Sequence, residues 1–310
     1  MTETIMLSLA AVLLCAFAAY FLLPHSSARA LIALNRKVSG LSVGAVTVGP
    51  HSVRYLSGGR GAPVLLLHGI FAEKDHWVDF ARALHGAYTI YAPDLPGFGE
   101  SRRFDEQRYD YDAQIERVKS FLDALGVERA HIAGSSMGGT LAALFALRYP
   151  TRVMSVAFIG APHGIRTPTR SEMDVAIDAG RPSPLIANTE TQFEAMLGFL
   201  FHRRPWLPYP VAFVARANAL RDASSNVRIW HEQLKDRYLL DAQIDTLQTP
   251  TLVLWGEHDR LFDASGAAVL RQRLPHADVQ PMPNVGHLPI LEAAKPAADA
   301  YTAFLSRVNG

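Results

Sequence analysis

The chain of 310 residues has only one cysteine, Cys15, which excludes an intramolecular disulfide and any cysteine-based metal cluster. It has almost no excess charge, with 30 Lys and Arg against 29 Asp and Glu, and no basic run or motif that indicates a nucleic-acid surface. The twelve histidines are scattered, without a metal-ligand spacing such as H-E-x-x-H. We therefore expect no metal, no cofactor and no nucleic-acid partner.

One long hydrophobic run is present, over residues 5–23, and it contains no charged residue. Its length suits a membrane-spanning helix better than the core of a signal peptide, which has about 7–15 apolar residues. The residues before it include no Lys or Arg, which also argues against a secretory signal. The small-residue sequence Ala28-Arg29-Ala30 keeps signal cleavage and export as the alternative.

Basic residues follow this run at Arg29, Arg36 and Lys37. The positive-inside rule then places the rest of the chain on the cytoplasmic side, at the inner membrane if the cell is bacterial. We expect a membrane anchor over residues 1–24 and a juxtamembrane segment over residues 25–42. The apolar spacing of that segment fits a helix along the bilayer surface and a plain connecting helix equally well.

From residue 43 onward, short apolar runs alternate with amphipathic stretches. Strands are predicted at residues 43–48, 52–56, 64–67, 88–92, 131–133, 153–159, 251–255 and 279–282, and helices at 77–84, 111–125, 140–148, 263–274 and 290–308. Gly49-Pro50 indicates a hairpin between the first two strands. This alternation predicts an α/β fold with a mostly parallel central sheet flanked by helices, built from residues 43–162 and 245–310.

Between residues 163 and 244 the alternation stops and prolines become frequent. Helical stretches are predicted there near residues 189–201, 211–220 and 226–240. We interpret this region as a helical cap, or lid, inserted over the sheet.

The sequence Gly134-Ser135-Ser136-Met137-Gly138 lies between a predicted strand and a predicted helix. G-x-S-x-G in that context is typical of a nucleophile elbow, a turn so tight that the outer two positions must lack side chains. A glycine- and serine-rich loop without function matches the bare pattern equally well. Ser136 is the candidate nucleophile.

A serine hydroxyl needs a neighbouring base, and that base needs an orienting acid. Asp259 and His287 each follow a late predicted strand, and the order Ser136, Asp259, His287 is the chain order of a serine triad in this topology. Asp263 is the alternative acid, although its position favours capping the next helix.

The backbone N–H of Met137, directly after the nucleophile, is one candidate donor to a developing oxyanion, and that of Ile70 is the other. Nearby polar side chains have simpler interpretations. We expect His68 to brace the Ile70 loop and Asp94 to stabilise the turn D-L-P-G-F-G.

The motifs L-L-L-H-G-I-F, A-P-D-L-P-G-F-G-E-S, G-S-S-M-G-G, L-W-G-E-H-D and V-G-H resemble the α/β-hydrolase superfamily, in particular bacterial lipases and esterases and the membrane-anchored monoacylglycerol lipase branch. The resemblance implies Ser136 as nucleophile, Asp259 as acid, His287 as base, and Ile70 and Met137 as the oxyanion hole. The pair Ile70-Phe71 departs from the Phe-Gly or Phe-Ser common after His-Gly in the family.

The function that follows is cleavage of monoacylglycerol-like or short-to-medium-chain acyl esters. One alternative is a serine C–C hydrolase of ring-cleavage products, although those enzymes usually carry Trp where Leu288 stands. Another is a small-ester esterase with haloperoxidase side activity. A non-catalytic relative would have lost a triad residue, and none is lost.

The substrate is expected to be a single-chain amphiphilic ester that reaches Ser136 beneath the cap. The apolar residues expected to contact it are Phe71, Phe199, Phe201, Trp206 and Leu288.

Overall fold

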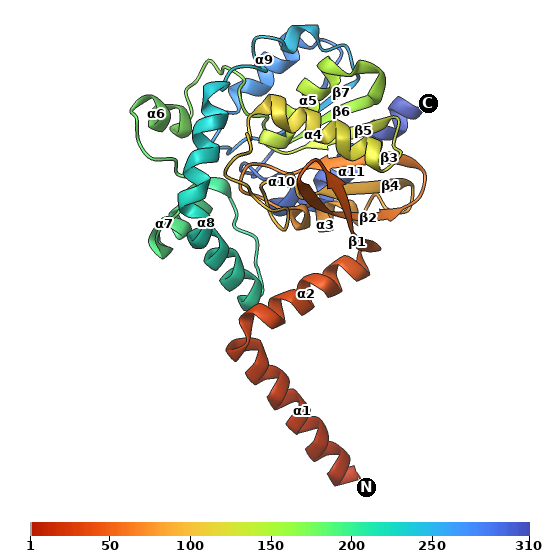
Figure 1. Ribbon diagram of the computed structural model, residues 1–310, viewed down its shortest axis with the longest axis vertical. Helices are drawn as coiled ribbons and strands as arrows, with labels where there is room; N and C mark the ends of the chain where they lie inside the picture. The colour runs from red at the N-terminus through yellow and green to blue at the C-terminus, as the bar shows by residue number, and fades with distance from the viewer. Residues whose placement is uncertain (1) are drawn as a thin grey trace.

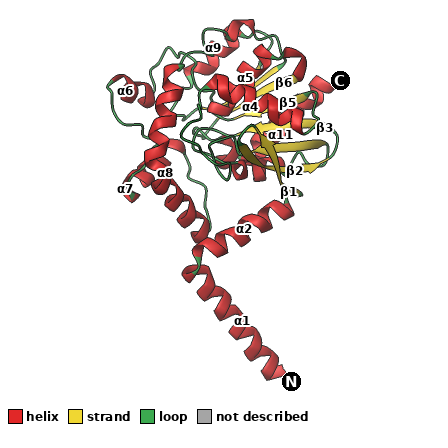
Figure 2. Cartoon of the chain, in the orientation of Figure 1, coloured by secondary structure: helices red, strands yellow, loops and turns green. Residues whose placement is uncertain are grey.

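A sheet of eight strands forms the centre of the molecule, and helices cover both of its faces (Figures 1 and 2). The computed structural model describes residues 2–310. The strand order is β1-β2-β4-β3-β5-β6-β7-β8. The strands are β1 (Leu41–Val48), β2 (His51–Gly59), β3 (Ala62–Leu67), β4 (Tyr88–Pro93), β5 (Ala130–Gly134), β6 (Val153–Ile159), β7 (Thr251–Gly256) and β8 (Asp278–Met282).

Strands β4, β3, β5, β6, β7 and β8, which are neighbours in this order, run parallel. Strands β1 and β2 form an antiparallel hairpin at one edge of the sheet. The hairpin turns at Gly49-Pro50, where Val48 pairs with His51, which confirms the predicted turn. Because parallel strands end at the same edge, the loops after β3, β5, β6, β7 and β8 meet there.

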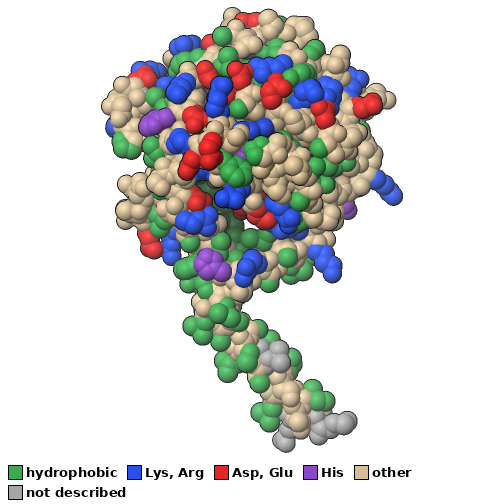
Figure 3. Space-filling view, viewed as in Figure 1, with side chains coloured by type: hydrophobic (Ala, Val, Ile, Leu, Met, Phe, Trp, Pro, Cys, Tyr) green, Lys and Arg blue, Asp and Glu red, His purple; other side chains and the backbone are tan. Residues whose placement is uncertain are grey.

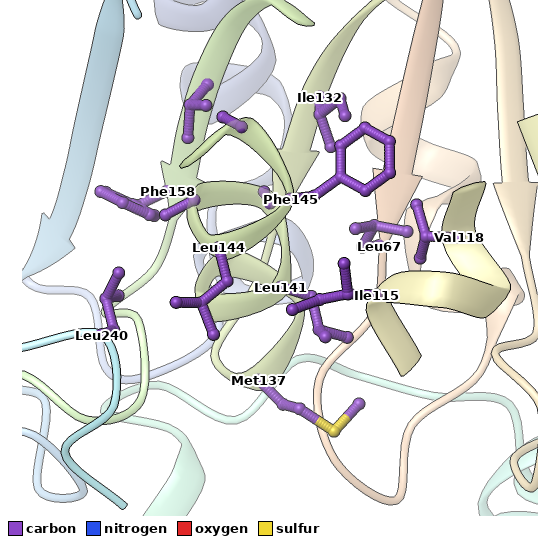
Figure 4. Packing of buried hydrophobic residues seen from close by; sticks show 14 of the residues in the cluster. Leu67, Ile115, Val118, Ile132, Met137, Leu141, Leu144, Phe145, Phe158 and Leu240 are labelled. Carbon is purple, nitrogen blue, oxygen red and sulfur yellow. The ribbon is translucent and has the colours of Figure 1, made fainter. Parts of the chain in front are cut away.

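Strand β3 shows how the sheet is buried on both faces. Leu65 and Leu67 pack into one core with α4 (Tyr111–Ala124), α5 (Met137–Arg148) and α9 (Ser265–Arg273), whereas Val64 and Leu66 pack into a second core with α3 (Val78–Ala81) and α11 (Ala294–Asn309). Alternate side chains of a strand point to opposite faces, so burial on both faces requires the continuous apolar run. Figure 4 shows Leu67 near Ile115 and Val118 of α4 in the first core.

Some helix boundaries differ from the prediction. The predicted helix 77–84 is a 3-10 turn, Lys74–Trp77, followed by the short α3. The predicted helix 290–308 is split at Ala293 into α10 (Pro289–Glu292) and α11. Two further 3-10 turns occupy Pro150–Arg152 and Ile244–Thr246.

Three helices lie between β6 and β7: α6 (Glu172–Asp178), α7 (Glu190–Leu200) and α8 (Tyr209–Lys235) (Figure 1). The prediction of separate helices at 211–220 and 226–240 was wrong, because α8 is a single helix of 27 residues. The residues between the two predicted stretches, 221–225, include neither Gly nor Pro. Nothing in them interrupts the backbone hydrogen bonds of the helix.

Helix α1 (Thr2–Leu22) extends away from the rest of the molecule, and its large apolar side chains are exposed (Figures 1 and 3). In the described chain it is the one helix long and apolar enough to cross a membrane, by length and composition.

Pro24 begins α2 (Pro24–Val38), which packs along α8. Arg36 of α2 holds Asp75 of the sheet domain in a two-pronged ion pair at 2.6 and 2.5 Å.

Candidate active site

Ser136 lies at the tip of a tight turn between β5 and α5, with φ 55° and ψ −120°. This left-handed conformation is rare for a residue with a side chain. A Cβ on Gly134 would lie 2.1 Å from the backbone of Gly138, and one on Gly138 would lie 2.1 Å from the carbonyl oxygen of Leu67. Both neighbouring positions therefore require glycine, and the turn has the geometry that the G-x-S-x-G motif predicts.

Asp259 follows β7 and His287 follows β8, and the two side chains meet. The Nδ1–H of His287 donates to Oδ2 of Asp259 at 2.8 Å. The other carboxylate oxygen accepts the N–H groups of Leu261 and Phe262 at 2.8 and 3.0 Å, which fixes the carboxylate in place. Because Nδ1 carries the hydrogen, Nε2 of the neutral imidazole has a free lone pair. This buried Nε2 has no hydrogen-bond partner among residues 2–310.

Asp263, the alternative acid, has a different contact. Its Oδ1 accepts the N–H of Ser265 at 2.9 Å, at the beginning of α9. This is an Asx turn just before α9, whose N-cap residue is Ala264, so Asp263 stabilises the turn that leads into the helix.

A pocket connects Ser136 to the helices inserted after β6. One side is formed by Ser136, Ile70 and Met137. Its apolar wall consists of Met173, Leu185, Trp230 and Phe262, and its polar side chains are Tyr111, His163 and Gln233. The ring of Phe262 lies 5.2 Å from that of His287 and 5.6 Å from that of His163, measured between centroids.

The N–H groups of Ile70 and Met137 are available at this pocket. Within residues 2–310 neither has a backbone acceptor. The Ile70 loop approaches Ser136 so closely that a Cβ on Gly69 would lie 3.3 Å from Cβ of Ser136. Two free N–H groups beside a serine form an arrangement that can stabilise negative charge on a carbonyl oxygen.

His68 braces this loop, as predicted. Its Nδ1–H donates to the carbonyl of Gly69 at 2.7 Å, and its Nε2 accepts the N–H of Leu95 at 2.9 Å. Complete burial lowers the pKa of His68 to about 4, so the imidazole is neutral at physiological pH. Both ring nitrogens are committed to the backbone, which leaves neither free for proton transfer.

Asp94 also matches the predicted structural role. Its carboxylate accepts the N–H groups of Lys74 and Glu100 at 2.7 and 2.9 Å and pairs with Nζ of Lys74 at 2.8 Å. These three bonds hold the turn after β4 against the loop after β3.

The five predicted substrate contacts are placed in different surroundings. Phe71 and Phe199 pack against the cluster of Met173, Trp230 and Leu261 that surrounds the pocket, and Leu288 is buried next to His287 in the chain. None of the five is among the residues that line the pocket, and the Trp206 side chain is 82% exposed. Trp206 precedes Tyr209, whose N–H donates to the hydroxyl of Tyr20 in α1 at 3.0 Å.

Sequence reasoning missed most of the residues that line the pocket. His163 follows β6 at the functional edge of the sheet, so its position after a strand was a usable signal. The others come from α4, from the inserted region 163–244 and from the loop after Asp259: Tyr111, Met173, Leu185, Trp230, Gln233 and Phe262. No local motif marks them. Residues 2–310 also contain no group of three or more His, Cys, Asp or Glu side chains that could hold a metal ion.

Comparison with known proteins gives consistent similarities. A family model described as alpha/beta hydrolase fold matches residues 62–294. Lipase 1 of Psychrobacter immobilis is 30% identical over 89% of this chain and 88% of its own length. Monoacylglycerol lipase abhd6-B of Xenopus laevis is 29% identical over 96% of this chain and 92% of its own. The crystal structure of a membrane phospholipase A, a bacterial virulence factor, superposes with a TM-score of 0.90 at 35% identity and covers 99% of both chains.

Proposed function

The chain belongs to the α/β-hydrolase fold family and is a hydrolase of the lipase and esterase kind, and on this premise we propose that it cleaves monoacylglycerol-like or short-to-medium-chain acyl esters. The reaction proceeds through an acyl-enzyme on Ser136, with His287 as base and Asp259 as its orienting acid. The observation that carries the proposal is the 2.8 Å bond from His287 to Asp259, which leaves a buried, unpartnered Nε2. A neutral imidazole so oriented is the base that a serine nucleophile requires.

In the first half of the reaction, Oγ of Ser136 attacks the ester carbonyl carbon while its proton passes to Nε2 of His287. The carbonyl oxygen becomes negatively charged and accepts the N–H groups of Ile70 and Met137. When the tetrahedral intermediate collapses, the bond to the alcohol breaks and His287 returns the proton to the departing alkoxide. Water then repeats the sequence on the acyl-enzyme and releases the carboxylic acid.

The composition of the pocket supports an apolar acyl group. Met173, Leu185, Trp230 and Phe262 form most of its wall beside the nucleophile. Each methylene of the substrate that such a wall removes from water contributes about 0.8 kcal/mol. In this proposal a single-chain amphiphile binds along this wall with its ester at Ser136. Phe71, Phe199 and Leu288 support the wall from behind in this proposal, whereas Phe201 and Trp206 are proposed to meet lipid nearer the membrane.

We also propose that residues 5–23 anchor the enzyme in a membrane. A helix of 21 residues is about 31 Å long, which matches the hydrocarbon thickness of a bilayer. Tyr20, Tyr209 and the exposed Trp206 lie where the anchor meets the catalytic part, as aromatic residues do at membrane interfaces. In this proposal, residues 1–24 are the anchor, 25–42 the juxtamembrane segment, 163–244 the cap, and 43–162 with 245–310 the core, on the cytoplasmic side. Export after signal cleavage is the alternative.

A phospholipid acyl ester is a second candidate substrate. It is supported by the structural similarity to a membrane phospholipase A over 99% of both chains. The C–C hydrolase alternative has less support, because Leu288 stands where those enzymes usually have Trp. None of the described residues that line the pocket is Lys or Arg, which a carboxylate-bearing ring-cleavage product would need.

The test is a substrate series on the detergent-solubilised full chain. With p-nitrophenyl esters of increasing acyl length, kcat/KM is expected to rise several-fold per added methylene and then level off when the pocket is full. Ser136→Ala should lower turnover by about 10⁴-fold or more, since it removes only the attacking oxygen. Mass mapping after treatment with an alkyl fluorophosphonate should find the label on Ser136 alone.

Two results would contradict this proposal. A rate that peaks at the acetyl ester and falls with each added carbon would favour a small-ester esterase. A Ser136→Ala variant that retains a tenth of the wild-type rate would exclude Ser136 as the nucleophile.

A further inference from the structure

Besides the N–H groups of Ile70 and Met137, two side-chain polar atoms in the apolar pocket have no hydrogen-bond partner among the described residues. They are Nε2 of His163 and Oε1 of Gln233. Both side chains are more than nine-tenths buried, at 7% and 2% exposure. A buried polar group without a partner costs stability, so a pair of them in one pocket points to a partner that arrives with the ligand.

The contacts of His163 define which of its nitrogens donates. Its Nδ1 lies 2.6 Å from the hydroxyl of Tyr111, and the hydrogen of that hydroxyl needs an acceptor because the phenol is buried. The buried phenol hydrogen therefore goes to Nδ1, and the hydrogen of the neutral imidazole is on Nε2. Burial lowers the pKa of His163 to about 4, so the ring is neutral at physiological pH. His163 thus offers a single N–H donor to the pocket.

The contacts of Gln233 define the complementary acceptor. Its Nε2 donates to the carbonyl of Tyr109 at 2.5 Å. Only the amide nitrogen can donate to that carbonyl, so Oε1 is the amide atom without a hydrogen-bond partner. Gln233 thus offers a single C=O acceptor to the same pocket.

The backbone holds this donor close to the nucleophile. The carbonyl of His163 accepts the hydroxyl of Thr140 at 2.6 Å, and Thr140 lies one helical turn after Ser136 in α5. The N–H of His163 also donates to the carbonyl of Ser136 at 3.4 Å. The position of the imidazole relative to the reacting serine is therefore fixed.

We propose that His163 and Gln233 form a polar subsite that binds the hydroxyl groups of an uncharged alcohol portion of the ester. A hydroxyl both accepts and donates, so it satisfies an N–H and a C=O together, whereas an acyl chain satisfies neither. None of the described lining residues is Lys or Arg, so a phosphate in this pocket would lack a counter-charge. The inference rests on the proposed ester hydrolysis and adds selectivity for a neutral polyol leaving group.

The experiment compares two esters of one acyl chain on the detergent-solubilised full chain. They are 1-monolaurin and propyl laurate, whose leaving alcohols have three carbons and differ by two hydroxyls. The measured quantity is the ratio of kcat/KM for monolaurin to that for propyl laurate. His163→Phe and Gln233→Met are each expected to lower this ratio by about 10- to 100-fold, since each removes one hydrogen bond to the leaving group.

The chain provides a matched control for each variant. His131 is also buried, with Nδ1 bonded to Ser155 and Nε2 unpartnered, but it lies in the core outside the pocket lining. Gln114 is buried with its Nε2 bonded to the carbonyl of Pro96 and its Oε1 unpartnered, also outside that lining. His131→Phe and Gln114→Met make the same chemical changes and should leave the ratio at the wild-type value.

If His163→Phe fails to fold, Tyr111→Phe provides the second test. This substitution removes the phenol hydrogen that keeps the imidazole hydrogen on Nε2 of His163. The kcat/KM ratio should therefore also fall, but by less than in His163→Phe. The rate at which a fluorophosphonate labels Ser136 reports whether each variant keeps a folded site.

The outcomes separate this inference from the proposed function. A wild-type ratio near one, or a ratio that neither pocket variant changes, would overturn the subsite while ester hydrolysis stands. Faster turnover of lauroyl lysophosphatidylcholine than of monolaurin would overturn the uncharged leaving group. If the wild-type chain hydrolysed none of these esters, the proposed function itself would fail, and the subsite with it.

Discussion

The main-chain N–H of His287 donates to the carbonyl of Leu200, the last residue of α7, at 2.9 Å. The same junction is held by Glu292, whose carboxylate accepts the N–H groups of His202, Arg203 and Gly286 at 3.2, 2.6 and 3.0 Å. The helices inserted after β6 are therefore fastened to the loop that carries the candidate base. A shift of α7 would also move the imidazole.

Glu292→Gln should weaken this junction. The neutral amide accepts hydrogen bonds less strongly than the carboxylate, so the loop of His287 should become less well oriented. We expect kcat to fall about 10-fold with a smaller change in KM, because misplacing a catalytic group affects the chemical step. Amide hydrogen exchange at His202 and Arg203 should become faster.

Glu257→Gln is the matched control, since Glu257 is an exposed carboxylate just after β7. It should leave both kcat and the exchange rates unchanged. Equal effects of the two variants would show that charge at this edge, and not the junction, sets the rate.

Asp259→Asn should lower kcat/KM by about 10⁴-fold at every pH, because the imidazole loses the acceptor that fixes its tautomer. Asp263→Asn keeps a side-chain oxygen that can accept the N–H of Ser265, so it should change neither the stability nor the rate appreciably. Steady-state kinetics and thermal unfolding of the two variants distinguish these roles. If Asp263→Asn were the inactive variant and Asp259→Asn mild, the acid would be misassigned.

Acid should destabilise the fold through its buried histidines. Burial lowers the pKa of His68 and His163 to about 4 from an ordinary value of 6.5. Between these values the unfolded chain binds protons that the folded chain does not, so the free energy of unfolding falls as pH falls. Each such histidine contributes a slope of about 1.4 kcal/mol per pH unit in this window.

His163→Phe removes one of these groups, so its free energy of unfolding should fall less than that of the wild type between pH 6.5 and 5. Burial raises the pKa of Glu73 to about 7, which acts in the opposite direction in both proteins and cancels in the comparison. Denaturant titrations at the two pH values measure the difference. Parallel pH dependence of the two proteins would exclude His163 as a buried neutral group.

Helix α1 should keep the full chain in the membrane fraction through high-salt and carbonate washes, because its exposed side chains are apolar. Binding through basic residues alone would be reversed by salt. Deleting residues 1–24 should release soluble protein that still reacts with a fluorophosphonate. A mature amino terminus just after Ala30, found by terminal sequencing, would refute the anchor.

The predictable parts of this molecule depend on local constraints. Gly134 and Gly138 were identifiable because the elbow leaves no space for a Cβ at either position. The central strands β3, β6 and β7 were identifiable because burial on both faces requires continuous apolar runs. Asp259 and His287 follow two of those strands, so their meeting at one edge follows from the topology.

The wall of the pocket was not predictable in this way. Met173, Leu185 and Trp230 meet Ser136 only because the inserted helices pack over the edge of the sheet, and that packing depends on contacts distant in sequence. Trp206 illustrates the same difficulty. Its apolar character suggested a substrate contact, but the side chain is exposed, on the segment that leads to Tyr209 and its contact with Tyr20 of α1.

The backbone of Ser136 has a further consequence. Its left-handed conformation costs a non-glycine residue about 1–3 kcal/mol, whereas glycine adopts it readily. Selection for folding stability alone would therefore favour glycine at position 136, whereas selection for catalytic activity would favour serine. At the turn that carries this candidate nucleophile, the lifetime of the folded molecule and its usefulness to the cell therefore oppose each other, as in enzymes that trade stability for activity.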